Sequence, residues 1–254
     1  MSSTDQELGL QLPGDFPHRN YLKVWNLARR FQSDDAARIE CNRQFGGAWN
    51  AVAYRFLLCS EADEASAKLI ANHTGSIDHA IRAKLANNLF MFFVAGQATV
   101  ESLAYAAHAM PAIFAYTGFC INTVEERRNV NLKLAGKQLT KAFHSLAIGS
   151  SLTCLATDRL YMRWEGLRNL LAHRLHPGEA IYVSAGGSPV ADRHLYERLE
   201  TPGPKGSAAH VEDVEINGKT TQQFRWWLTQ KLAGLFAEVA ELAEVLFGSL
   251  PDPP

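Results

Sequence analysis

The region that decides the fold is residues 78–108, DHAIRAKLANNLFMFFVAGQATVESLAYAAH. Apolar residues such as Leu85, Leu89 and Leu103 recur there at helical spacing and form a broad stripe. A helix with so wide an apolar face needs more than one neighbouring helix to cover it. The sequence therefore predicts a long central helix over about this range, ending before Pro111, within a helical bundle.

Helical periodicity continues on both sides of this region. The stretch Thr123-Val124-Glu125-Glu126 is typical of a capping box, in which a threonine and a glutamate close the first turn of a helix. The neighbouring glycines Gly46 and Gly47 favour a kink or a break. Further helices are expected over residues 21–32, 34–58, 64–72, 123–146, 151–175 and 222–247.

Residues 180–216 differ from the rest of the chain because glycine, proline and serine are frequent there. Strand-like runs at 180–184 and 211–216 flank these loops, and Asn217-Gly218 is typical of a hairpin turn. We expect a loop-rich insertion with a small sheet before the last helix. The expected fold is mainly all-α, a single domain over 1–254 with an N-terminal helical extension over 1–75.

The composition excludes several classes of protein. Hydrophobic residues make up 47% of the 254 residues, which suffices for a core and argues against disorder. A formal net charge of -1 means that any contact with nucleic acid must be a local patch.

The start of the chain lacks the features of a signal peptide, and polar residues interrupt the most apolar stretch, 89–116. We expect a cytoplasmic protein with no membrane span, whose four scattered cysteines are buried thiols.

One hexapeptide carries the functional signal: Arg168-Asn169-Leu170-Leu171-Ala172-His173. Asn169 and His173, together with Glu165, fall at i, i+4 and i+8 and share one face of the expected helix. Arg168 precedes His173 by five residues, which is roughly 140° around a helix. Only the length of the arginine side chain therefore brings its guanidinium toward the imidazole.

These residue types suit the cleavage of RNA by its own 2′-hydroxyl, which attacks the neighbouring phosphorus. Histidine titrates near about pH 6.5, so it transfers protons in either direction at neutral pH. Arginine offers a fork of donors that matches phosphate oxygens. We assign proton transfer to His173, stabilisation of the phosphorane to Arg168, and positioning to Asn169. The scheme needs no metal and no cofactor.

The hexapeptide resembles the Arg-(Asn)-x(4–6)-His signature of the HEPN superfamily, the higher eukaryote and prokaryote nucleotide-binding domains. This resemblance implies a helical bundle over about 77–247, interrupted by the 180–216 insertion, and a homodimer in which two motifs form one cleft. Many members are metal-independent endoribonucleases of toxin and defence systems, which implies RNA as substrate and an antitoxin or defence protein as partner. Other members are non-catalytic modules for nucleotide or RNA binding or for oligomerisation, and that alternative stays open.

Three charged residues are expected to support the motif. Glu101 either orients His173 or Arg168, or is a polar residue at a helix interface with a cationic partner. Glu165 shares the motif face, or simply pairs with Arg168 at i, i+3. Arg174 offsets the repulsion between phosphate and the negative end of the helix dipole.

Two further groups have a functional and a structural interpretation. Lys133, Lys137 and Lys141 recur at i, i+4 and i+8, and they are either a track for the RNA backbone or a solvated helix face. Trp226 and Trp227 either stack on bases or divide between core and interface.

Overall fold

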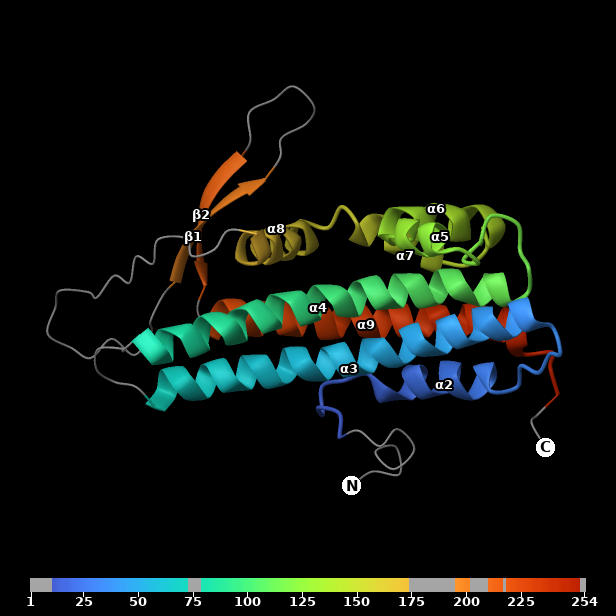
Figure 1. Cartoon of the computed structure of the whole chain (residues 1–254), viewed down its shortest axis with the longest axis horizontal. Coiled ribbons are helices and arrows are strands. Elements are labelled where there is room, and N and C mark those ends of the chain that lie inside the picture. The colour runs from blue at the N-terminus through green and yellow to red at the C-terminus, as the bar shows by residue number, and fades with distance from the viewer. Residues whose placement is uncertain (1–10, 73–78, 174–194, 202–209, 217, 252–254) are drawn as a thin grey trace, which may run out of the picture. The chain divides into compact units, whose positions relative to one another are not determined.

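The structure is a computed structural model, and it describes residues 11–72, 79–173, 195–201, 210–216 and 218–251. Within these residues the chain is mainly helical, which confirms the expected mainly all-α fold, and it contains one two-stranded sheet (Figure 1). The elements in chain order are α2 (His18–Ala28), α3 (Ala36–Asn72), α4 (His79–Ile113), α5 (Val124–Asn129), α6 (Leu132–Ala142), α7 (Ile148–Leu155), α8 (Arg159–His173), β1 (Leu195–Thr201), β2 (His210–Ile216) and α9 (Gly218–Phe247).

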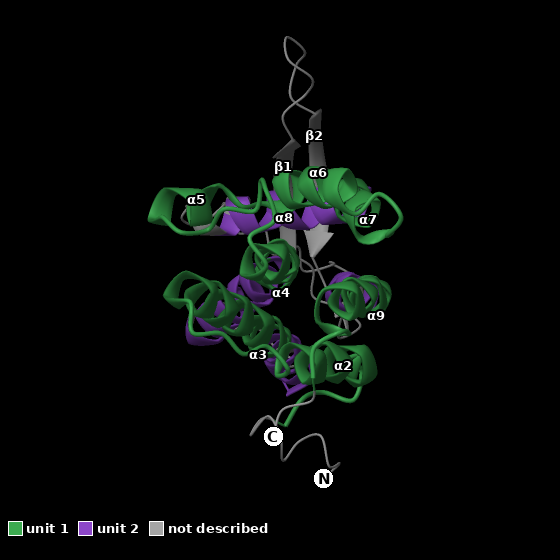
Figure 2. Cartoon of the chain, turned by 90° about the vertical axis from the view of Figure 1, so that its right-hand side faces the viewer, with its two compact units in different colours: residues 1–56, 98–158, 228–254 green, residues 57–97, 159–227 purple. Residues whose placement is uncertain are grey.

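The chain forms two compact units, which Figure 2 distinguishes by colour. The first unit comprises residues 1–56, 98–158 and 228–254, and the second comprises 57–97 and 159–227. Helices α3, α4 and α9 each contribute residues to both units. The boundaries of these two units differ from the expected boundaries of the N-terminal extension, the bundle and the insertion. The single-domain organisation stays a prediction.

An aromatic cluster forms the core of the first unit. The ring of Tyr21 on α2 stacks on Trp49 of α3, with ring centroids 5.0 Å apart. The Tyr21 hydroxyl donates to the Trp49 carbonyl at 3.3 Å, and the Trp49 indole donates to the Tyr21 carbonyl at 3.2 Å. Phe236 of α9 packs against both rings. Burial of these large side chains fixes α2 to α3 and α9.

The second unit is built around Trp164 of α8, which is 1% exposed. Its indole stacks on Phe92 of α4 at 5.3 Å between ring centroids and meets Phe224 of α9 edge-on at 5.0 Å. The indole nitrogen donates to the Phe93 carbonyl at 2.8 Å. A Cβ atom at Gly96 would overlap the indole, so this glycine lets α8 approach α4 closely.

The two strands pair antiparallel, and their register runs from Leu195 opposite Ile216 to Thr201 opposite His210. The expected strand at 211–216 is confirmed as part of β2, whereas the other expected strand, 180–184, lies outside the described residues. The hairpin turn expected at Asn217-Gly218 is wrong. Gly218 is the first residue of α9, and the strand that pairs with β2 precedes it in the chain.

Helix α3 is continuous, so the break expected at Gly46-Gly47 is wrong. The piece expected as a separate helix over 64–72 is likewise part of α3. An interior glycine lowers helix stability by only about 0.5–1 kcal/mol relative to alanine. Burial of large neighbours such as Phe45 and Trp49, each 1% exposed or less, outweighs that loss.

The segment 123–146, which was expected to form one helix, contains two. Its capping box is confirmed, because the Thr123 hydroxyl accepts from the Glu126 amide and the Glu126 carboxylate accepts from the Thr123 amide. The segment nevertheless divides into α5 and α6, and the Asn131 side chain caps α6 by accepting from the Leu134 amide at 3.0 Å. The helix expected over 151–175 is also two helices, α7 and α8. Short polar side chains compete with the helical backbone at such breaks.

Helix α4 extends further than expected, because it includes Pro111 and ends at Ile113. A proline this near the end of a helix removes one hydrogen bond, and the buried neighbours Met110 and Ile113, both 0% exposed, hold the last turn. Among the described residues, α4 is the one helix long and apolar enough to cross a membrane, over Ala83–Ile113. Of its most apolar window, 67% is buried inside the structure.

Candidate functional site

Helix α8 carries the hexapeptide 168–173, and Trp164 holds this helix against α4. Arg168 is half-buried, and its Nε donates to Oε1 of Gln97, which is 2% exposed. A buried side-chain amide needs a hydrogen-bond partner. The bond therefore satisfies Gln97 and fixes the position of the guanidinium relative to α4, next to Gly96.

The remaining residues of the motif are placed only in part. Asn169 is exposed, and Glu165, one turn earlier on the same face of α8, is half-buried. His173 is the last described residue of α8, and its side chain lies outside the described part of the structure, as does all of Arg174. The structure thus brings Arg168 together with Gln97, and its convergence with His173 stays a prediction.

Sequence reasoning missed Gln97 as the partner of Arg168, because the two residues are 71 positions apart. One signal was present, since Gln97 is a polar residue within the long apolar helix that the sequence predicts. A buried amide in such a helix demands a polar neighbour from another element. Which element supplies that neighbour follows only from the packing of Trp164 on α4.

Glu101 and His108 lie on α4 in different surroundings. Glu101 is exposed and belongs to the first unit, whereas Arg168 belongs to the second, so the expected orienting role of Glu101 stays a prediction. His108 is 1% exposed, and its ring centroid lies 5.0 Å from that of Phe119. Burial lowers the pKa of His108 to about 4. Its imidazole is therefore neutral at neutral pH and contributes to packing.

The lysine row is confirmed as a feature of one helix face. Lys133, Lys137 and Lys141 all lie on α6 and are exposed, while Leu132 and Leu139 form part of its buried face. This arrangement gives the row access to solvent. Its role as an RNA track stays a prediction.

The two tryptophans of α9 have different surroundings. Trp227 is 5% exposed and packs against Trp164 and Tyr161 of α8, with ring centroids 5.9 and 6.5 Å away. Trp226 is 66% exposed. The pair therefore divides between core and surface, as one of the two interpretations of the sequence predicted.

In the described part of the chain, the cysteines neither form disulfides nor gather with acidic residues around a metal site. All four cysteines are free thiols, but only Cys41 and Cys59 are buried, so the expectation of burial is wrong for the exposed Cys120 and Cys154. Within the part of the chain that the structure describes, no three histidine, cysteine, aspartate or glutamate side chains gather as they would around a metal ion.

A hollow of about 420 Å³ lies in the first unit and is lined by α3, α4 and one residue that follows α5. Small residues of α3 line part of it, and charged or polar side chains line the rest. Its lining residues are Arg43, Gln44, Gly47, Ala48, Ala51, Arg55, Glu101, Ser102, Tyr105 and Val130. One sequence pattern indicates this surface, because Arg43, Gly47, Ala51 and Arg55 recur every fourth residue along α3.

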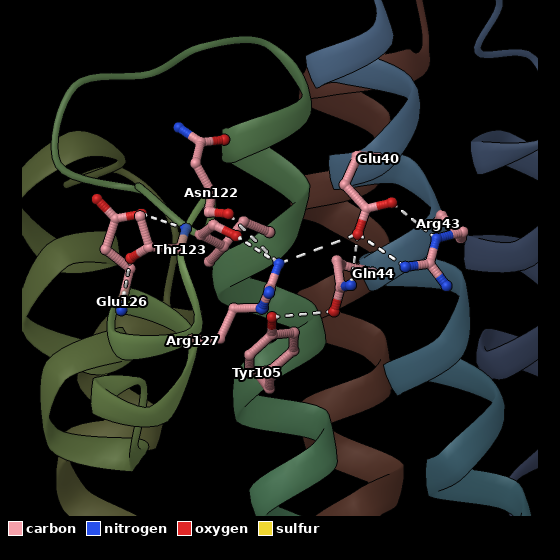
Figure 3. Close-up of polar contacts among 9 residues, drawn as sticks. Glu40, Arg43, Gln44, Tyr105, Asn122, Thr123, Glu126 and Arg127 are labelled. Carbon is pink, nitrogen blue, oxygen red and sulfur yellow. Dashed lines mark hydrogen bonds and ion pairs between the residues drawn. The ribbon is translucent and has the colours of Figure 1, made fainter.

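A polar network borders this hollow (Figure 3). The Glu40 carboxylate accepts from Arg43 Nε at 2.7 Å and from Gln44 Nε2 at 2.6 Å, and the Arg127 guanidinium lies 4.0 Å away. The Tyr105 hydroxyl donates to Gln44 Oε1 at 3.3 Å. The hydrogen bonds from Arg43 and then from Gln44 lower the pKa of Glu40 to about 2. Glu40 therefore stays ionised and neutralises Arg43 near neutral pH.

Comparison of the chain with protein-family models, curated proteins and solved structures finds no match. Any function must therefore be argued from the residues and their contacts. The described residues contain two candidate sites: the Arg168–Gln97 pair of α8 and α4, and the hollow along α3.

Proposed function

We propose that this chain is a HEPN-like, metal-independent endoribonuclease that cleaves RNA by attack of the 2′-hydroxyl on the adjacent phosphorus. The observation that carries the proposal is the Arg168 guanidinium, which is half-buried and bonded to the buried Gln97 within an Arg-Asn-x-x-x-His sequence. A cation that the protein holds in place stabilises developing charge without having to reorganise during the reaction. An arginine on a freely moving surface side chain lacks that advantage.

The proposed roles account for the bond changes and for one of the two proton transfers, and water serves as the partner in the other. The 2′-oxygen forms a bond to phosphorus, the bond from phosphorus to the 5′-oxygen breaks, and the products are a 2′,3′-cyclic phosphate and a 5′-hydroxyl. His173 takes the proton from the 2′-hydroxyl or delivers one to the leaving 5′-oxygen. Arg168 stabilises the charge on the phosphorane, and Asn169 positions the phosphate or the imidazole.

Several supporting roles belong to the same proposal. Glu165 and Glu101 orient the motif, Arg174 adds positive charge beside it, and Lys133, Lys137 and Lys141 contact the RNA backbone. The enzyme acts as a cytoplasmic homodimer in which two motifs complete one cleft, in a toxin or defence setting with an antitoxin or defence protein as its partner. The homodimer and the toxin or defence setting follow from the resemblance of the hexapeptide to the HEPN signature, whereas the lysine contacts and the cytoplasmic location follow from the sequence pattern.

The test is cleavage of a labelled single-stranded RNA in EDTA, with the product ends identified by mass spectrometry. We expect wild-type protein to leave a 2′,3′-cyclic phosphate and His173→Ala to lose roughly 10²–10⁴ in rate, the usual contribution of a general acid or base. His144→Ala removes an exposed histidine of the first unit and is the matched control, expected to keep full activity. Equal rates for His173→Ala and wild type, with both proteins folded, would exclude a catalytic role.

A non-catalytic binding or assembly module is the second candidate, and one observation favours it. Arg168 is engaged with a buried side chain, which is also what a structural arginine does. In that case wild-type protein shows no RNase activity, and His173→Ala changes the molar mass measured by light scattering from dimer to monomer. The two candidates therefore differ in the behaviour of the wild-type protein.

A further inference from the structure

We propose that the hollow along α3 binds a small molecule through a singly charged oxyanion, a phosphodiester or a carboxylate, which pairs with Arg55. All the residues that line the hollow belong to the first unit. Arg168 and His173 belong to the second unit, so this inference goes beyond the proposed RNA cleavage. The two proposals share only Glu101, and Arg55 has no part in the proposed cleavage.

Arg55 is the residue that carries the inference. Its side chain is half-buried, and Nη1 donates to the Ala98 carbonyl at 3.0 Å and to the Ser102 hydroxyl. Both partners are neutral, and no carboxylate among the described residues forms an ion pair with this guanidinium. A half-buried charge without a counter-ion is unfavourable, so an anion from solution is the natural complement.

The hydrogen bonds around Arg55 also fix its orientation. The Ser102 hydroxyl donates to the Ala98 carbonyl at 2.7 Å while it accepts from Arg55, so one network joins Arg55 of α3 to Ala98 and Ser102 of α4. Ser102 is 4% exposed. A guanidinium that is held in this way loses little conformational freedom when it binds an anion.

The other charges of the hollow limit the ligand to a single negative charge. Arg43 is neutralised by Glu40, and Arg127 lies near the same carboxylate. Of the two arginines that line the hollow, Arg55 alone has no carboxylate partner among the described residues, which leaves one positive charge. A phosphodiester or a carboxylate matches that remainder.

The size and the lining of the hollow indicate a small ligand. A volume of about 420 Å³ lies within the range of small-molecule pockets, roughly 300–1,000 Å³. Gly47, Ala48 and Ala51 leave space for the body of the ligand, and the Tyr105 ring lies on the wall. A Cβ atom at Gly47 would meet nothing within 4 Å, so the hollow is open at that residue.

Isothermal titration calorimetry with three probes tests the proposal. Adenosine 3′,5′-cyclic monophosphate supplies a phosphodiester, N-acetylglycine supplies a carboxylate, and adenosine is the neutral control. We expect one of the two anions to bind at one site per chain, which identifies the class, and adenosine not to bind. Failure of both anions to bind would overturn the proposal, as would equal binding of adenosine and the anions.

Variants then assign the binding to Arg55. Arg55→Met should weaken the affinity for the anion roughly ten- to hundredfold, which is the contribution of a charged hydrogen-bonded contact. Arg128→Met removes an exposed arginine outside the hollow and should leave the affinity unchanged. Gly47→Leu adds a side chain to the wall of the hollow, at a position where a Cβ atom meets nothing within 4 Å, and should abolish binding while the protein stays folded. This variant keeps the test valid if Arg55→Met unfolds. Unchanged affinity in Gly47→Leu or in folded Arg55→Met contradicts the assignment.

Discussion

Gly96→Ala is the substitution whose effect follows most directly from the packing of the second unit. Alanine in place of an interior helical glycine normally stabilises a protein by about 0.5–1 kcal/mol. At Gly96, however, the new methyl group would overlap the Trp164 indole. That ring cannot move without disturbing its stacking on Phe92 and its hydrogen bond to the Phe93 carbonyl. Overpacking of about 1–3 kcal/mol and a lost hydrogen bond of about 1 kcal/mol outweigh the gain, so we expect a net loss of about 2 kcal/mol.

Urea unfolding followed by circular dichroism measures this change, and Gly234→Ala is the matched control. Gly234 lies on the exposed face of α9, and a Cβ atom there meets nothing within 4 Å. We expect this variant to gain about 0.5–1 kcal/mol, which is the opposite sign. In the double variant Gly96→Ala, Trp164→Phe, the smaller ring should recover part of the loss, with a coupling energy of at least about 0.5 kcal/mol. A stabilised Gly96→Ala, or additive effects in the double variant, would refute the packing described for Trp164.

Two other predictions concern buried side chains. The pKa of His108 is lowered to about 4 in the folded state, against 6.5 for the free side chain, so the unfolded chain binds this proton more readily. The free energy of unfolding should therefore fall as the pH is lowered from 6.5 to about 4. In urea titrations at several pH values, His108→Leu should lack this part of the pH dependence. The same pH dependence in His108→Leu and wild type would contradict the prediction. Trp227→Ala should lose about 3–5 kcal/mol because the ring is buried, whereas Trp226→Ala should change stability by no more than about 0.5 kcal/mol; equal losses would contradict the two environments.

Local signals in the sequence predicted local structure well. The capping box at Thr123 and Glu126 involves only four neighbouring residues, and it is present as expected. The strand at 211–216 and the last helix were also recognisable from their own residues. In each case the interactions that decide the structure lie within a few positions of one another.

Predictions failed where distant contacts decide the outcome. Gly46 and Gly47 favour a break locally, yet the buried aromatic side chains along α3 keep the helix continuous. The division at Asn131 is a different kind of failure, because it rests on a local signal that was overlooked: the Asn131 side chain caps a second helix by accepting from an amide only three residues along. The sequence pattern of a single helix does not reveal when tertiary packing overrides local helix propensity.

In the candidate site, too, the residues of the local motif were predicted and their distant partners were not. Arg168 and Asn169 were identified from one hexapeptide, but Gln97, which orients Arg168, comes from a helix 71 positions earlier. The hollow beside Arg55 was not predicted at all, because its walls come from two long helices whose relative placement depends on the whole core of the first unit.

The reciprocal hydrogen bonds between Tyr21 and Trp49 have a practical consequence for work with shortened forms of the protein. Removal of the segment that ends with α2 would expose one face of the Trp49 indole and part of Phe236 to water, and would leave the indole N–H without its acceptor. Newly exposed aromatic surface of this kind promotes self-association. Residues 16–28 should accordingly be retained in any truncation, since their loss would create an artificial surface for self-association.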